Sequence, residues 1–570
     1  MENFNIEIDT KKLKELVSIY EPSVFLGEIT AILKYDGYGR IPFLPFIALD
    51  SPLRQLSYIA ALNLSSDVER IKTTKAPTND EWTDIMEYAV RIKAGYYDAL
   101  LPKPEEDDQE YDRLYRIAAP VFFDYFDTGV INYEEQEIAK ILDLFKPFDA
   151  LIQAHFGLTT NDFIKIYESL DERLESLLNE PLRLIRENPE VKAFKDEMLK
   201  SETPPSEWHY KGGSPEVKRF IDLMSNHLHQ NRLKAEKDEK TQKFISIFSI
   251  SREASDFRFY TENNPILVRP IFRLGNEHIL LLAPKQLLHA IHKTLLSFII
   301  STPKSEKFFI HRGKWLQHKC MSLFKKFLKG EGHYYNEFKV DGEGQDILVL
   351  FGSLAFIIEA KAGKEAVLSS RPNIRYLYTQ YVKTFKQNID EGYDQAFRIK
   401  EKFIDREPFD ICDKNNKLTY RVRAKNYRNA FSIIITLDRF RGPQINLPSL
   451  LDPYQDDVFP LSLSIDDLEV IILTMLKLQI SPGHFERLLI KREKLQGRTN
   501  SNDEMEIWGH LLFNREFKVP EDPTLTFHPG SAAATQFDEL YKTGLGFENE
   551  RKLDKKKSKE WKVVFGTFRP

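Results

Sequence analysis

The chain has 570 residues, of which 42% are hydrophobic and 29% are charged, and its formal net charge is −5. A chain of this length is too long for one hydrophobic core, so we expect two to four domains of an ordinary soluble protein. Only two cysteines occur, so we expect neither a disulfide framework nor a structural zinc site. The N-terminus lacks the basic flank and apolar run of a signal peptide, so we expect a cytoplasmic protein without a membrane span.

The first half of the chain changes from helical to strand-like spacing at about residue 240. Residues 1–235 carry apolar residues mostly at helical intervals, which predicts an all-helical N-terminal domain. In the segment 240–300, the apolar runs 265–274 and 278–283 flank Gly-Asn-Glu, which predicts a β-hairpin, and a helix is expected at 285–300. We expect this segment to pack on the domain that follows it.

Residues 301–440 predict a compact α/β unit with the order α-β-β-β-α-β. The expected elements are a helix at 312–329, a strand at 333–340, a hairpin at 345–361, a long helix at 376–403 and a strand at 430–437. A Pro-containing linker at 441–450 then leads to a mixed C-terminal region, 450–570, with a helix at 465–478 and a basic tail at 551–562.

Charge is distributed unevenly along the chain. Residues 301–440 contain 26 Lys and Arg against 17 Asp and Glu, a balance of +9, whereas the rest of the chain carries −14. A polyanion would be attracted to the first part and repelled from much of the second, which favours a bounded binding channel over contact with the whole surface.

The hairpin at 345–361 brings together two carboxylates and a lysine. If Gly352 and Ser353 form a two-residue turn of type II′, the register places Asp346 opposite Glu359. Opposed like charges with Cβ atoms roughly 5 Å apart are destabilising unless a cation lies between them. Strand alternation puts Glu359 and Lys361 on one face, so two hard oxygen ligands and an ammonium would share one edge of an apolar sheet. The alternative is a solvated strand face, since Glu-x-Lys is common in a highly charged chain.

The Asp346…Glu359-Ala360-Lys361 pattern, with the order of elements around it, resembles the PD-(D/E)xK superfamily of restriction-endonuclease-like nucleases over residues 300–440. The resemblance implies that Asp346 and Glu359 bind Mg²⁺ (or Mn²⁺), with the main-chain carbonyl of Ala360 as a further ligand, and that Lys361 positions the attacking water.

Two further positions bear on this resemblance. Many members carry a glutamate on the helix before the sheet, but Gln317 stands there in this chain, so a single metal, or a second one held through water or Glu337, is more plausible than a full two-metal site. The resemblance adds a polar residue on the helix after the lysine strand to the catalytic set; Gln395 is preferred for it, with Gln387 as the alternative. These glutamines have the alternative of being ordinary helix-surface residues.

The resemblance predicts a metal-dependent endonuclease that cuts DNA rather than RNA, of the kind found as effectors of restriction or anti-phage defence. No phosphate-binding loop of the GxxxxGK[ST] type occurs, so any ATPase activity or regulation would come from a partner protein, and an oligomer is compatible with the sequence. The alternatives are a catalytically inactive nucleic-acid-binding protein that keeps the nuclease fold, and a helical scaffold.

Overall fold

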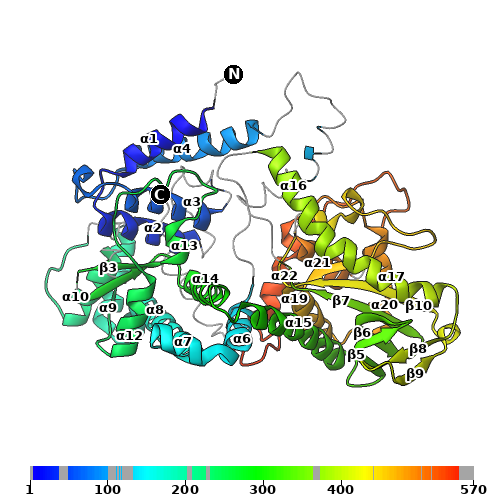
Figure 1. Ribbon diagram of the computed structural model, residues 1–570. Coiled ribbons are helices and arrows are strands. Elements are labelled where there is room, and N and C mark those ends of the chain that lie inside the picture. The colour runs from blue at the N-terminus through cyan, green and yellow to red at the C-terminus, as the bar shows by residue number, and fades with distance from the viewer. Residues whose placement is uncertain are drawn as a thin grey trace.

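The computed structural model describes residues 4–36, 49, 51–99, 111, 114, 115, 117, 132–201, 208–225, 232–275, 277–363, 373–440, 442–501, 503–514 and 516–550. It is a multidomain α/β protein with two mixed sheets (Figure 1). The basic tail at 551–562 lies outside the described residues. Among the described residues, no helix combines the length and the apolar character needed to cross a membrane.

The N-terminal part is built mainly of helices, several of which start at a residue whose side chain caps the helix. Thr78 and Thr159, for example, accept hydrogen bonds from the backbone amides of Glu81 and Asp162, three residues further on. The helices longer than one turn are α1 (Ile6–Val17), α2 (Pro22–Asp36), α3 (Pro52–Leu64), α4 (Asn79–Asp98), α6 (Glu134–Phe145), α7 (Asp149–Phe156), α8 (Thr160–Glu187), α9 (Pro189–Lys200) and α10 (Pro215–Ser225).

A small sheet completes this N-terminal lobe. Its order is β1-β4-β3-β2, with β1 (Arg232–Lys234), β2 (Ser249–Ile250), β3 (Ile271–Leu274) and β4 (His278–Leu281). The predicted hairpin around Gly275 is confirmed as the antiparallel pair β3 and β4. Two expectations are wrong in detail: β1 lies inside the range expected to be all-helical, and residues 265–268 form the helical turn α13 (Pro265–Val268), because Pro265 directly after the cap Asn264 favours a helix start.

The segment 240–300 packs against the N-terminal helices. Side chains of α12 (Glu239–Phe248), β3, β4 and α14 (Gln286–Ile300) are buried together with those of α6 and α8 in one apolar cluster. A second cluster joins β3 and β4 to α1, α3 and α4. The segment therefore shares its hydrophobic core with the N-terminal helices rather than with the larger sheet.

The larger sheet has the order β11-β10-β7-β6-β5-β8-β9 (Figure 1). The strands are β5 (His333–Val340), β6 (Glu343–Phe351), β7 (Leu354–Lys361), β8 (Phe409–Cys412), β9 (Leu418–Val422), β10 (Asn429–Thr436) and β11 (Leu461–Ser464). The expected α-β-β-β-α-β order is present, with the hairpin of β8 and β9 added before the last strand. Strand β11 comes from the range expected to form a C-terminal region, so the sheet continues past residue 450.

Helices cover both faces of this sheet. On one face, the core includes residues of α15 (Ser305–Phe327), α19 (Ile465–Lys477), α20 (Pro482–Lys494) and α21 (Glu504–Phe513). On the other face lies the predicted long helix, which is divided into α16 (Ile374–Phe385), a π-helical segment (Lys386–Asp390) and α17 (Glu391–Ile404). The short helices α18 (Gly442–Ile445) and α22 (Thr535–Tyr541) complete the described chain.

Candidate active site

The hairpin formed by β6 and β7 has the predicted turn and register. Phe351 pairs with Leu354 across Gly352 and Ser353, and the antiparallel ladder continues to the pair Ile347 and Ile358. Gly352 has φ +56°, which the first turn position of a type II′ turn requires and which glycine adopts without strain. The next residues along the two strands are Asp346 and Glu359, so the two carboxylates lie side by side at the end of the ladder.

Hydrogen bonds hold the two acids in place. The backbone amide of Ala360 donates to Asp346 Oδ2 at 2.8 Å, and the backbone amide of Asp346 donates to Glu359 Oε1 at 3.3 Å. Each carboxylate is therefore fixed by the main chain of the opposite strand, which gives the pair a defined geometry before any ligand binds.

Glu359 is a buried acid in an unfavourable electrostatic environment. Its side chain is 2% exposed. Burial, and next the negative charge of Asp346, raise the pKa of Glu359 well above its ordinary value, while Lys361 opposes the shift. A strongly perturbed carboxyl beside a second carboxyl is a feature of functional sites, because nothing in the fold itself requires such an arrangement.

Lys361 extends from the end of β7 toward α17. Its Nζ atom lies 3.9 Å from Glu359 Oε2 and donates a hydrogen bond to Oε1 of Gln395 on α17. Helix α17 approaches this side chain closely at Gly392, where a Cβ atom would lie 3.2 Å from Lys361 Cε and 3.1 Å from Ile434 Cγ2. The structure thus brings together Asp346, Glu359, Lys361 and Gln395, which the sequence interpretation assigned to one site.

The π-helical segment sets the position of α17 over the site. Asn388, in this segment, packs so tightly against Gly363 that a Cβ atom on Gly363 would lie 1.9 Å from Asn388 Oδ1. The helix is therefore anchored to the chain two residues after Lys361. A continuous α-helix would rotate the later residues to a different face, so this irregular turn is part of what brings Gln395 to the lysine.

Gln317 reaches the site from α15. Its Nε2 atom donates to Asp346 Oδ1 at 2.7 Å, and its Oε1 atom is buried with no hydrogen-bond partner. A buried carbonyl-type oxygen without a donor, next to two carboxylates, fits the coordination of a hard cation such as Mg²⁺, whose remaining ligands are usually water. Within the described residues, no three His, Cys, Asp or Glu side chains form a metal-binding group, so a cation at this place would need Gln317, backbone or water oxygens.

Glu337, the other candidate for holding a second ion, is engaged elsewhere. It has φ +50°, a left-handed conformation that is unusual for a residue inside a strand, at the point where the β5–β6 ladder is interrupted next to Asp346. Its carboxylate pairs with Lys414, which lowers the pKa of Glu337. No sequence pattern pointed to this strained position.

Arg312 is a neighbour of the site that sequence reasoning missed. Its guanidinium donates to the carbonyl of Ala362, directly after Lys361, and the residue is 9% exposed. Burial lowers the pKa of Arg312, while Asp438 opposes the shift. The only sequence signal was its place on α15, five residues before Gln317.

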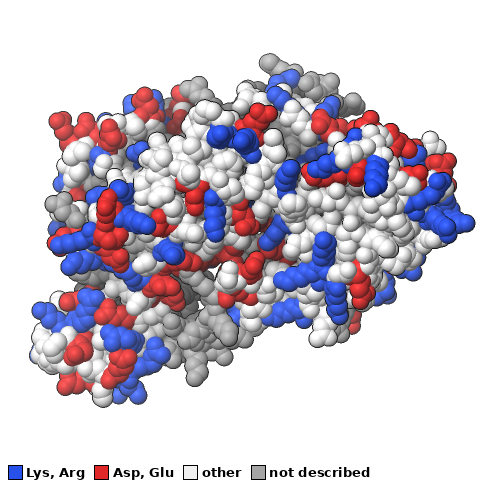
Figure 2. Space-filling view, turned by 60° about the horizontal axis from the view of Figure 1, so that its bottom comes forward, with Lys and Arg blue, Asp and Glu red and all other residues white. Residues whose placement is uncertain are grey.

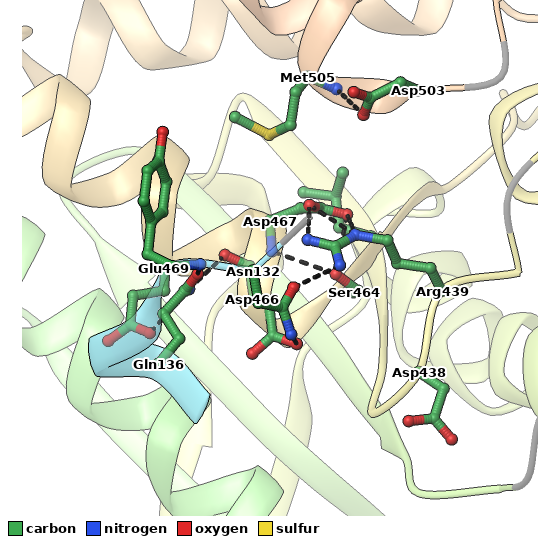
Figure 3. Close-up of polar contacts among 12 residues, drawn as sticks. Asn132, Gln136, Asp438, Arg439, Ser464, Asp466, Asp467, Glu469, Asp503 and Met505 are labelled. Atoms are coloured by element: carbon green, nitrogen blue, oxygen red, sulfur yellow. Dashed lines mark hydrogen bonds and ion pairs between the residues drawn. The ribbon is translucent and has the colours of Figure 1, made fainter. Parts of the chain in front are cut away.

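A polar network links the end of the sheet at which β7 and β10 finish to the N-terminal lobe (Figure 3). Arg439, just after β10, donates to Asp467 from Nη2 at 2.6 Å and also donates to Asn132, which precedes α6. Lys140 on α6 forms a 2.6 Å ion pair with Asp466 at the start of α19. Because β10 pairs with β7 up to Lys361, the network is continuous with the strand that carries the lysine.

Comparison with known protein families, with curated proteins and with solved structures finds no match. The function of the site must therefore be argued from its own geometry.

Proposed function

We propose that the chain is a metal-dependent endonuclease that hydrolyses phosphodiester bonds, with DNA as its expected substrate. The observation that supports this proposal most directly is the pairing of Asp346 with the buried Glu359 at the end of one hairpin, with Lys361 within reach of both the acid and Gln395. A fold has no structural need for two neighbouring acids of which one is nearly inaccessible, whereas a cation-binding site does.

The residues divide into two roles. Asp346, Glu359 and the carbonyl of Ala360 hold a Mg²⁺ or Mn²⁺ ion, with the unpartnered Oε1 of Gln317 at the same place. A bound ion of this kind supplies electrostatic stabilisation of the charge that develops on the phosphoryl oxygens.

Lys361 orients the attacking water and the phosphate. Its ammonium is positioned by Glu359 on one side and by Gln395 Oε1 on the other, so its remaining protons point away from the helix. Gly392 allows α17 to close on the aliphatic part of the side chain, which limits its rotamers. Preorganisation of this kind is what places a reactant within attacking distance.

The N-terminal lobe is suited to regulation of this site. Its helix α6 is joined to the start of α19 by the largely shielded ion pair between Lys140 and Asp466. Arg439, just after β10, donates a hydrogen bond to Asn132, which precedes α6, and β10 adjoins the lysine strand. A nuclease core attached to a large helical lobe fits an effector of restriction or anti-phage defence, in which a partner protein or signal controls cleavage.

The test is incubation of the purified protein with supercoiled plasmid, linear duplex, single-stranded DNA and RNA, with Mg²⁺, Mn²⁺ or EDTA. We expect cutting that needs the metal and is lost in Glu359→Ala. The control is Glu343→Ala, which removes a carboxylate from the exposed start of β6 and should cut normally. Cutting that persists in Glu359→Ala would refute the assigned site, and absence of cutting in every sample would favour a nucleic-acid-binding protein without catalysis.

A further inference from the structure

The hairpin of β8 and β9 lies beside the candidate active site at the free edge of the larger sheet (Figure 1). Lys414, in the turn of this hairpin, pairs with Glu337 on β5, at the point where the β5–β6 ladder is interrupted next to Asp346. The strained Glu337 therefore connects the hairpin to the catalytic strands. The core order expected from the sequence did not include this hairpin.

Positive charge is concentrated on the hairpin and on the segment after it. Residues 414–428 contain Lys414, Lys417, Arg421, Arg423, Lys425 and Arg428, and no acidic residue. Lys414, Arg421 and Arg428 form ion pairs with acids on neighbouring elements. The side chains of Lys417, Arg423 and Lys425 are exposed and have no ion pair among the described residues. Lys and Arg side chains project at this end of the molecule (Figure 2).

A row of rings lies along the same edge. His333, at the exposed start of β5, stacks on Tyr420 of β9 with a centroid distance of 5.4 Å and an interplanar angle of 27°. Tyr420 in turn lies 5.7 Å from Tyr335 at 31°. Leu418, at the start of β9 where a bulge interrupts the pairing with β8, is 56% exposed, which is unusual for a large apolar side chain on a sheet edge.

We propose that the edge formed by β9 and the start of β5 binds single-stranded nucleic acid, with His333, Leu418 and Tyr420 contacting unpaired bases and Arg423 and Lys425 contacting phosphates. This inference rests on the proposed function, because it names the substrate class of that site. The exposed ring of His333 stacked on the half-buried ring of Tyr420, next to unpaired cations, is the kind of platform on which proteins hold single strands. A duplex presents its phosphates to such a surface but keeps its base faces stacked inside, so it would leave the rings unused.

The position of this edge fits delivery of a strand to the site. His333 lies four residues before Glu337 on β5, a distance of roughly 13 Å at 3.3 Å per residue. A strand held on the rings would therefore reach Asp346 within a few nucleotides. The positive charge that would attract the phosphates of the strand is confined to this part of the surface, since the chain as a whole is acidic.

The experiment measures binding of fluorescent oligonucleotides to the full-length protein in EDTA, so that no cleavage occurs. We compare a single strand with its duplex for wild type, for His333→Ala, and for the double variant Arg423→Ala/Lys425→Ala. The matched control is Lys192→Ala/Lys218→Ala, which removes two exposed lysines from α9 and α10 in the N-terminal lobe and changes the net charge equally.

We expect wild type to prefer the single strand and His333→Ala to weaken single-strand binding about fivefold or more, the effect of losing one stacked base. The double variant should lower the slope of log affinity against log salt by about 1.4, the value for two lost phosphate contacts, whereas the control should leave it unchanged. Equal loss in the double variant and its control, or tighter binding of duplex than of single strand, would overturn the inference.

Failure of this inference is distinguishable from failure of the proposed function. Cutting that depends on Glu359 and metal, together with normal single-strand binding by His333→Ala and by Arg423→Ala/Lys425→Ala, would refute the inference and leave the nuclease intact. Single-strand binding that is lost in these two variants, in a protein that cuts no substrate, would refute the nuclease and keep the edge as a binding surface.

Discussion

The replacement of Glu359 by glutamine should make the metal-free protein more stable and at the same time remove its response to metal. Glutamine keeps the size of the side chain and the oxygen that accepts from the amide of Asp346. It removes only the charge. In the wild type, burial and Asp346 raise the pKa of Glu359 well above the ordinary 4.5, so the folded protein must either bury a charge or bind a proton.

The magnitude follows from two opposing pair interactions and from linkage. At an effective dielectric constant of about 20, the attraction to Lys361 at 3.9 Å is about 4 kcal/mol. Repulsion from the adjacent Asp346 is of similar size, because its effect on the pKa of Glu359 ranks directly ahead of that of Lys361. The two nearly cancel, so the desolvation penalty of the buried carboxylate decides the sign.

A raised carboxyl pKa favours the folded state at low pH, and this contribution is lost as pH rises above the ordinary value. The advantage of Glu359→Gln should therefore grow by about 1.4 kcal/mol per pH unit from pH 4.5 upward, until the pKa of the folded state is reached.

The assay is denaturant unfolding of both proteins from pH 4.5 to 8, in EDTA and in excess Mg²⁺ or Ca²⁺. Metal should stabilise the wild type by mass action and leave the variant unchanged. Glu343→Gln, an exposed carboxylate on β6, serves as the control and should show neither effect. A variant that is less stable than wild type across the whole pH range, or that metal stabilises equally, would refute the reasoning.

Three further changes test other parts of the site. Lys361→Ala should abolish cutting while the affinity for nucleic acid changes little; equal activity would refute its role. Gly392→Ala places a methyl group 3.2 Å from Lys361 Cε and 3.1 Å from Ile434 Cγ2, so cleavage should fall about tenfold, as expected for a displaced catalytic group, with a small loss of stability. Unchanged cleavage would show that the lysine tolerates the shift. Burial, followed by the charge of Asp467, raises the pKa of Asp503 from 3.8 to about 7. The contribution of this carboxyl to the free energy of unfolding is therefore lost as the pH rises from about 4 to about 7. Asp503→Asn keeps the hydrogen bond that caps the helix at Met505. It should stabilise the protein at pH 8 by about 2 kcal/mol, which is half of the full linkage value because the residue is partly open to water. At pH 4 the stabilisation should nearly vanish. A stabilisation independent of pH would contradict this reasoning.

The sequence alone was sufficient for the hairpin that carries the acids. A two-residue Gly-Ser turn joins two continuous apolar runs and fixes the register of their pairing, and that register sets Asp346 beside Glu359. The strands β5 and β10 and the helices α14 and α19 were predictable for the same reason, because local periodicity and burial agree there.

Other features were decided only by tertiary structure. The π-helical segment that directs Gln395 to Lys361 depends on the contact between Asn388 and Gly363, residues 25 positions apart. The left-handed Glu337 pairs with Lys414, 77 residues further along the chain, and the segment 240–300 packs on helices from the first third of the chain. Such contacts leave no periodic trace in the sequence, because each joins residues distant along the chain through shape and charge that exist only after folding. Local patterns therefore placed the acids and the lysine, whereas long-range packing determined which side chains surround them.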